Sequence, residues 1–221
     1  MLTLFRYISL ENSQLGHKTK SSGAVLLESI RIKNGHADLL PYHQRRVDRS
    51  RRALFGKPPA LKLDKILSEI DLPLSGLYKL RIEYGTEVLK QELVPYTART
   101  INSLKLVEAE NFAYGKKFTD RSGIRKCLEK KGHCDDILMV QKGHLTDASY
   151  ANIALFDGQH WYTPAWPMLR GTRREQLLEL GVIRPIVIRA RDLDSFGKLR
   201  LMNAMLPWEE APTLDCSAII R

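Results

Sequence analysis

The sequence predicts a mixed α/β protein of the α+β type with two lobes. Its 221 residues, 43% of them hydrophobic, suffice for one large domain or two small ones. Residues 40–54 carry a helical pattern, whereas residues 77–96 alternate apolar and polar side chains around a Tyr-Gly-Thr turn, which is typical of a β-hairpin. We therefore expect an N-terminal α/β lobe over residues 1–105 and a larger, β-rich C-terminal lobe over residues 106–221.

In the N-terminal lobe, two strands are expected first, over residues 2–9 and 24–32. A helix then begins near Leu40 and runs to Leu54, where the stretch Gly-Lys-Pro-Pro-Ala ends it because glycine and proline disfavour a helix. Residues 61–72 place apolar side chains close to a helical period, so a second helix is expected before the hairpin.

Strands dominate the expected C-terminal lobe. One helix is expected over Asp120–Lys131 and another over residues 171–181, with Gly181 at its C-terminal end. The expected strands are residues 103–110, 135–140, 144–147, 150–156, 160–164 and 183–190, and residues 200–207 are expected to close the ordered part of the chain. A cleft between two lobes, joined near residues 97–112, is a usual place for a ligand.

The chain carries a formal net charge of +10, and five arginines concentrate in residues 43–52. Such a charge can indicate nucleic-acid binding, but no aromatic stacking pattern and no nucleic-acid-binding signature accompany it. A solvated helix face is the plain interpretation, and a third is that one arginine binds the phosphate of a small ligand. Nucleic acid is therefore not expected as a partner.

Three cysteines, Cys127, Cys134 and Cys216, are too few for a disulfide framework in a chain of this length. Two of them lie near His133, but a second ligand pair at the spacing of a zinc finger is missing, so no metal is expected. No apolar run approaches the roughly 18 residues that a membrane span needs, and the N-terminus lacks the pattern of a secretory signal. We expect a cytoplasmic protein without a membrane partner.

Four short motifs, each weak alone, occur in an informative order: HQRR, KKFTDR, GHLTDASYANIALF and LRGTRREQL. Together they resemble the class IV aminotransferases, which are fold type IV pyridoxal-phosphate enzymes. That family includes branched-chain and D-amino-acid aminotransferases and 4-amino-4-deoxychorismate lyase. The resemblance runs from about Leu27 to Pro207 and is closest from Lys117 onward. It implies a two-lobed fold like that of D-amino-acid aminotransferase, pyridoxal 5′-phosphate as cofactor, and a homodimer.

Such an enzyme needs a lysine amine that holds the cofactor as a Schiff base and moves protons at the substrate. In the lyase branch this lysine is followed by three residues and an arginine, which matches Lys117 and Arg121. If residues 111–118 are an extended strand end, Lys116 and Lys117 point to opposite faces, so only one reaches a cleft. The resemblance implies Lys117 as the catalytic lysine, whereas Lys116 is expected to be a solvated surface residue.

The ring nitrogen of the cofactor needs a carboxylate that keeps it protonated. Asp147 matches this position, with Asn152 five residues later, although the family typically has glutamate there. Because aspartate is one methylene shorter, either the strand lies closer to the ring or the contact is looser. A turn or capping role beside Ser149 is the alternative for Asp147.

The cofactor phosphate needs an arginine and backbone N–H groups at a helix N-terminus. The family pattern of histidine, two residues, arginine and an aliphatic residue is matched by His43, Arg46 and Val47, which implies Arg46 as a phosphate ligand. His43 itself is expected to be a packed or capping residue. The remaining residues that the resemblance implies near the phosphate and the substrate carboxylate are Gly171, Thr172, Arg173, Asn203 and Ala204.

Glu28 and Arg31 match a family strand that contributes to substrate specificity. A glycine-rich segment usually precedes this strand, but here residues 17–25 retain little of it. Arg31 is a candidate for binding a substrate carboxylate, with Glu28 beside it, and a surface arginine on an edge strand is the alternative.

The motifs favour a pyridoxal-phosphate-dependent enzyme that acts on a small substrate with an amino group. KFTDR and NAMLP favour 4-amino-4-deoxychorismate lyase, which forms 4-aminobenzoate and pyruvate. The alternative is an amino-acid aminotransferase of the branched-chain or D-amino-acid type, which would share every residue named above. An inactive family member with a binding role is the remaining hypothesis.

Overall fold

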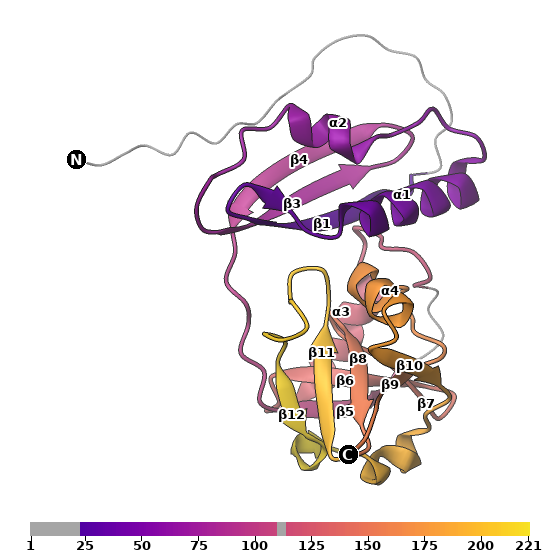
Figure 1. The fold of residues 1–221 in the computed structure, drawn as a ribbon. Helices are drawn as coiled ribbons and strands as arrows, with labels where there is room; N and C mark the ends of the chain where they lie inside the picture. Colours follow the sequence, from indigo (N-terminus) through magenta and orange to yellow (C-terminus); the bar gives the residue numbers. More distant parts are fainter. Residues whose placement is uncertain (1–22, 110–113) are drawn as a thin grey trace.

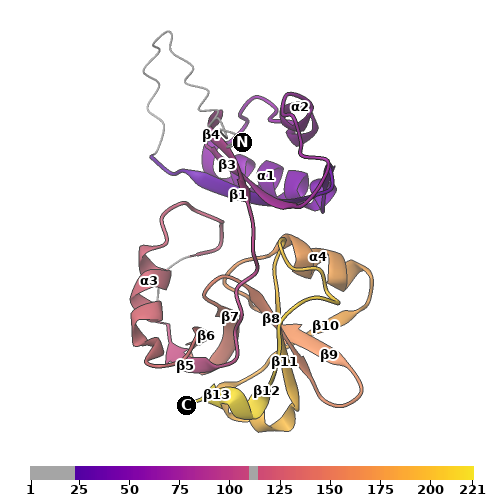
Figure 2. The same ribbon diagram turned by 90° about the vertical axis from the view of Figure 1, so that its left-hand side faces the viewer.

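The computed structural model describes residues 23–109 and 114–221. The strand expected over residues 2–9 lies outside them, as does part of the segment before Lys117. The described chain forms two sheets, each with its own helices and buried core, and Figures 1 and 2 show one sheet above the other. The mixed α/β class predicted from the sequence is confirmed.

The first part of the fold consists of β1 (Leu26–Lys33), β2 (His36–Ala37), α1 (Leu40–Phe55), α2 (Leu63–Ser68), β3 (Leu77–Tyr84) and β4 (Val88–Pro95). Its sheet is antiparallel, in the order β2-β1-β3-β4. Because side chains alternate along a strand, Leu26 and Ile30 of β1 face one side, where they pack with Val47 of α1 and Leu63 of α2. Both helices therefore cover the same face, and the odd-numbered side chains of β1 are left to the other face.

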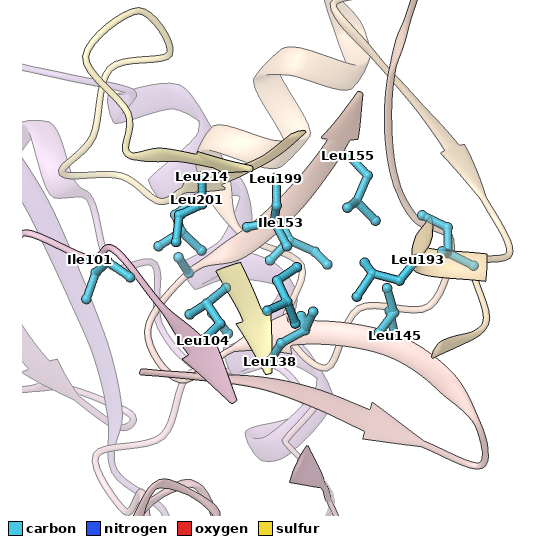
Figure 3. Close-up of a cluster of buried hydrophobic side chains, with 14 of the residues drawn as sticks. Ile101, Leu104, Leu138, Leu145, Ile153, Leu155, Leu193, Leu199, Leu201 and Leu214 are labelled. Carbon is cyan, nitrogen blue, oxygen red and sulfur yellow. The ribbon is translucent and has the colours of Figure 1, made fainter. Parts of the chain in front are cut away.

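The second sheet consists of β5 (Leu104–Glu108), β6 (Asp136–Gln141), β7 (His144–Ala148), β8 (Asn152–Phe156), β9 (Trp161–Pro164), β10 (Ile183–Ile186), β11 (Lys198–Met202), β12 (Thr213–Asp215) and β13 (Ile219–Ile220). The strand order is β10-β9-β8-β7-β6-β5-β13, and β11 joins β12 to β8. Figure 3 shows its core, in which Ile153 of β8 and Leu201 of β11 point toward Leu104 of β5 and Leu138 of β6. The side chains of β5, β6, β8 and β11 thus pack into one core. At one end of it, the end of β7 and the start of β8 pair through Asp147 and Asn152.

The helices of the second part are α3 (Ser122–Leu128), α4 (Thr172–Glu179) and the 3₁₀ helices η1 (Glu129–Lys131), η2 (Ala190–Ser195) and η3 (Cys216–Ala218). Helix α4 lies against α1 of the first part, where Arg45 Nε is 3.1 Å from Glu175 Oε1 and Tyr42 donates to Glu179 across 3.0 Å (Figure 1). None of the helices that the described residues form combines the length and apolar character needed to cross a bilayer.

Most elements lie close to where the sequence placed them, but several boundaries differ: the strand expected over residues 183–190, for example, ends at Ile186. The helix expected from Asp120 begins at Ser122, because Asp120 Oδ1 instead accepts a hydrogen bond from the Ser122 backbone. The expectation that residues 200–207 close the ordered part is wrong: β12 and β13 follow, and β13 pairs in parallel with β5. These strands of three and two residues are too short for a periodicity signal, although Leu214 and Ile219 are buried in the core.

Candidate functional site

Lys117 lies where the chain between β5 and α3 touches the start of β1. Its carbonyl accepts a hydrogen bond from the Leu27 backbone across 2.8 Å, and the next residue, Phe118, forms an isolated bridge to Leu26. The extended strand end expected here is not found in the described part of the segment, since residues 115–116 form a bend and Phe118 alone pairs. Backbone hydrogen bonds on both sides of this bridge, from Leu27 to Lys117 and from Thr119 to Val25, hold Lys117 against the first sheet.

The amine of Lys117 is surrounded by protein atoms, although part of the residue's surface stays accessible. Burial, and after it the charge of Arg46, lowers the pKa of Lys117 from 10.5 to about 7, against the opposing effect of Glu28. A substantial fraction of this amine is therefore neutral near pH 7. Lysines with a lowered pKa of this kind can act as nucleophiles and bases.

A buried ion cluster joins α1 to β1 beside this lysine. His43 and Arg46 are three residues apart on α1 and share one helix face. Arg46 donates to Glu28 from Nε (2.9 Å) and Nη2 (2.5 Å), and His43 Nδ1 is 2.5 Å from the same carboxylate. Burial raises the pKa of Glu28, but Arg46 and His43 outweigh it and hold that pKa at about 2. Glu28 is thus an ionised carboxylate that orients Arg46, whose Nη1 this pair does not use.

Asp147 lies in a buried pocket of neutral donors between β7 and β8. It pairs in register with Asn152, whose Nδ2 donates to Asp147 Oδ1 across 2.7 Å, and the Leu169 backbone donates to Oδ2 across 2.9 Å. Burial raises the pKa of Asp147 to about 6, although these donors oppose the rise. The carboxylate is held in a fixed orientation, and no side chain in the described part of the chain forms a direct ion pair with it.

The N-terminus of α4 adjoins this pocket. Gly171 caps the helix, and a Cβ added to it would lie 2.1 Å from Asn152 Oδ1, so any larger residue here would force the Asn152 side chain to move. Asn152 Nδ2 also donates to the Leu169 carbonyl across 2.8 Å. The next residue, Thr172, is buried, and its Oγ1 has no hydrogen-bond partner among residues 23–109 and 114–221. A buried hydroxyl without a partner at the positive end of a helix suits an anion that would accept its hydrogen.

The other residues expected at the site lie in two places. Asn203 and Ala204 form a half-buried turn after β11, in which Asn203 Oδ1 accepts from the Met205 backbone and Nδ2 donates to the Tyr150 carbonyl. Arg31 is buried, and it donates from Nη1 to Asp38 Oδ2 across 2.8 Å. It is therefore not a surface arginine within this chain.

One residue links the two halves of the candidate site. The Tyr114 phenol has a raised pKa, chiefly through burial, and Arg121, Arg46 and Asp147 all act on its charge. It therefore lies within electrostatic reach of both the Arg46 cluster and the Asp147 pocket. Sequence reasoning missed Tyr114, and the only signal for it was its place three residues before Lys117.

Arg174 was also missed, and nothing in the sequence set it apart from its neighbours. Its side chain is buried beneath α4, where Nη2 donates to the Pro164 carbonyl across 2.8 Å and Nε to Thr163 Oγ1 across 3.2 Å. Its charge opposes the rise in the pKa of Asp147. Arg174 therefore acts on Asp147 through its charge alone, since the hydrogen bonds of its guanidinium go to Pro164 and Thr163.

Known proteins resemble this chain in sequence. The family model of amino-transferase class IV matches residues 91–210, which is more than half of the chain. An uncharacterized protein of Haemophilus influenzae is 34% identical over 183 residues, covering 81% of this chain and 97% of that protein.

Solved structures resemble it in fold. A candidate 4-amino-4-deoxychorismate lyase from Haemophilus somnus is 31% identical, with a TM-score of 0.78 over 83% of this chain and 97% of that one. A hypothetical aminotransferase of Mycobacterium tuberculosis in its pyridoxal-phosphate-bound form has a TM-score of 0.71 over 96% of this chain and 90% of its own. At 16% identity, this second likeness concerns the fold alone.

Proposed function

Because the chain belongs to the class IV aminotransferases, we propose that it is a pyridoxal-phosphate-dependent enzyme whose catalytic amine is Lys117. The observation that carries this proposal is the position of Lys117. The first sheet binds its backbone, Arg46 and Glu28 act on its charge, and its pKa lies at about 7. An amine that is partly neutral near physiological pH can both attack a carbonyl carbon and accept a proton.

The other candidate residues have the chemistry that the cofactor would need. The free Oγ1 of Thr172, the backbone at the start of α4 and Arg46 Nη1 would bind the phosphate, with Glu28 holding the Arg46 fork in place. Asp147 would accept a hydrogen bond from the protonated ring nitrogen, since its carboxylate is buried and oriented by Asn152. When bound, pyridoxal phosphate supplies an electron-poor ring that accepts the electron pair left by a broken bond at the amine-bearing carbon of the substrate.

Within this chemistry we favour the 4-amino-4-deoxychorismate lyase reaction. Its support is the likeness, at 31% identity, to the candidate lyase of Haemophilus somnus, together with the motifs around Lys117 and Asn203. Lys117 would remove the proton from the ring carbon that bears the amine. It would then deliver a proton to the methylene carbon of the departing enolpyruvyl group, which leaves as pyruvate, while the ring becomes 4-aminobenzoate. The expected homodimer is part of this proposal.

Absorption spectroscopy tests the cofactor and the lysine together. The purified protein, supplied with pyridoxal phosphate, should show a visible band that borohydride removes, and peptide mapping should then find the reduced cofactor on Lys117. Lys117→Ala should abolish both signals, whereas the neighbouring control Lys116→Ala should retain them. A protein that takes up no cofactor, or that is labelled equally after Lys117→Ala, would sink the proposal.

Product analysis separates the two reactions. The lyase forms 4-aminobenzoate and pyruvate from 4-amino-4-deoxychorismate in equal amounts and needs no second substrate. An aminotransferase instead consumes a keto acid and converts it to an amino acid. Amino transfer that depends on a keto acid, without 4-aminobenzoate, would replace the lyase reaction with the aminotransferase reaction and keep Lys117 in its role.

A further inference from the structure

The turn between β7 and β8, residues 148–151, connects the two residues of the buried carboxylate pocket. Asp147 precedes this β7–β8 turn, and Asn152, with which it pairs, follows it. Within the turn, the backbone N–H of Ala148 donates to the Ala151 carbonyl across 2.9 Å. A movement of the β7–β8 turn would therefore displace the carboxylate and the amide that orients it.

Side chains from three other places in the fold bind the β7–β8 turn. Arg121, the residue before α3, donates from Nη2 to the Ser149 carbonyl. Asn203 Nδ2 donates to the carbonyl of the next residue, Tyr150, across 3.3 Å. Asp136, fully buried at the start of β6, accepts a hydrogen bond from the Ser149 side chain. Two successive carbonyls of the turn are thus fixed, one by an arginine and one by an asparagine.

Arg121 belongs to the same short stretch of chain as Lys117. Leu27 of β1 donates to the Lys117 carbonyl across 2.8 Å, and the Thr119 backbone donates to the Val25 carbonyl across 2.9 Å. Four residues of extended chain span at most about 14 Å. The stretch from Lys117 to Arg121 is therefore bound to the first sheet at one end and to the β7–β8 turn at the other, with little slack between them.

The charge of Arg121 acts at both ends of this link. Burial is the largest cause of the lowered pKa of Lys117, and the charges of Arg46 and Arg121 contribute to it. Burial raises the pKa of Asp136, and Arg121 is among the groups that oppose the rise. The guanidinium group thus lies within electrostatic reach of the candidate catalytic amine and of the carboxyl group that binds the turn.

We propose that Arg121 is a positioning residue, which holds the β7–β8 turn, and with it Asp147, at a fixed distance from Lys117. In the proposed enzyme, Lys117 and Asp147 would act on the carbonyl carbon and the ring nitrogen of one cofactor, so their separation must match a single ring. This consequence for the reaction rests on the function proposed above, whereas the link between the two segments follows from the contacts of Arg121.

Hydrogen–deuterium exchange of residues 147–152, followed by mass spectrometry on the cofactor-free protein, tests the link. Arg121→Met removes both the donor and the charge, so exchange should be about tenfold faster. Arg121→Lys keeps the charge but replaces a planar fork with a single ammonium, so exchange should still rise. The rate of Lys117 acetylation as a function of pH should show a higher pKa in Arg121→Met and a nearly normal one in Arg121→Lys. The control Arg125→Gln removes an exposed cation of α3 and should leave both measurements unchanged.

The rate of product formation then tests the consequence for the reaction. In Arg121→Met, 4-aminobenzoate formation should fall about tenfold or more, and the loss should lie in kcat, because a misplaced group slows the chemical step more than it weakens substrate binding. Arg121→Lys should lose less, and Arg125→Gln should lose nothing. A loss confined to KM, or one that Arg125→Gln reproduces, would contradict a positioning role.

Two outcomes separate the link from the proposed function. If the protein takes up no pyridoxal phosphate but exchange and acetylation respond as expected, the proposed function fails and the link stands. If the protein takes up the cofactor while exchange of residues 147–152 is unchanged in an Arg121→Met variant with native circular dichroism, the link fails and the proposed function stands. If Arg121→Met does not fold, Arg121→Lys decides, and exchange at the wild-type rate in that variant would overturn the link.

Discussion

Glu28 and Asp147 are both buried carboxylates of the candidate site, yet their surroundings act on them in opposite directions. Glu28 lies in the first part of the fold, where two cationic partners hold its pKa at about 2. Asp147 lies in the second part, where an amide and backbone N–H groups leave its pKa at about 6. Both side chains are at most 4% exposed, so the difference comes from their partners and not from the degree of burial.

The contrast follows from how each partner offsets the cost of burial. A guanidinium fork supplies a full opposite charge at hydrogen-bond distance, which offsets the desolvation of Glu28. Neutral donors orient Asp147 without offsetting the same cost. In the proposed enzyme the two carboxylates would therefore differ in role. Glu28 would neutralise and orient Arg46, whereas the charge of Asp147 would remain available for a cofactor cation.

Removing Glu28 should cause the largest effect. Glu28→Gln leaves the buried Arg46 without its counterion, and losing one partner of a buried ion pair costs about 3–5 kcal/mol of unfolding free energy. Urea denaturation of the wild type and the variant measures this loss. The matched control is Glu179→Gln on α4, whose pair with Arg45 is exposed and whose loss should hardly alter stability. Equal stabilities for Glu28→Gln and the control would refute the ion-pair interpretation.

The pH dependence of stability should have opposite signs for the two carboxylates. The pKa of Glu28 falls from 4.5 to about 2 on folding, so its contribution is complete above pH 4.5 and is lost as the pH drops toward 2. The pKa of Asp147 rises from 3.8 to about 6, so its contribution is complete below pH 3.8 and is lost as the pH rises toward 6. Each change amounts to about 3 kcal/mol.

Denaturation curves from pH 2 to 7 separate these contributions. Relative to the wild type, Glu28→Gln should lose the decline on the acid side, and Asp147→Asn should lose the decline between pH 4 and 6. The other carboxylates affect the wild type and both variants alike, so only the differences count. A decline between pH 4 and 6 that survives in Asp147→Asn would show that another group causes it.

The packing of Asn152, which orients Asp147, should depend on the absence of a side chain at Gly171. Gly171→Ala adds a methyl group that overlaps Asn152 Oδ1, and overpacking of this kind costs about 1–3 kcal/mol. Asn152→Ala removes the overlap, so the double variant should be more stable than the sum of the two single losses predicts. Gly197→Ala is the control, since its added Cβ would meet nothing within 4 Å. Simple additivity in a denaturation cycle would contradict the close contact.

Site residues that belong to short motifs could be predicted from the sequence. Lys117, Arg46 and Gly171 each belong to a compact pattern, and the structure places Lys117 within electrostatic reach of Arg46 and Gly171 against Asn152. Glu28 was expected near the substrate, but the structure places it fully buried against Arg46. An alternating strand pattern does not reveal which polar residue will face a helix that carries a cation.

Contacts between segments far apart in the chain could not be predicted from the sequence. Asp38 joins Arg31 to Arg173 only because the fold brings the loop before α1 against the start of α4. No local spacing encodes such a contact. The short strand β13 was missed for a similar reason, since two residues carry no period and pair only because β5 offers a free edge.

The smallest of the expected effects is a change in the pKa of Lys117, which shows whether Glu28 or Asp147 influences this amine more strongly. Glu28 raises the pKa of Lys117 against the effects of burial and Arg46, so Glu28→Gln should lower that pKa below about 7. Asp147→Asn should shift it less, because Lys117 depends most on burial and on the Arg46 cluster. The rate of acetylation of Lys117 as a function of pH, followed by mass spectrometry before cofactor is added, measures both values, with Lys116 as the internal reference. A larger shift in Asp147→Asn than in Glu28→Gln would reverse the assignment and place the amine under the control of the second part of the fold.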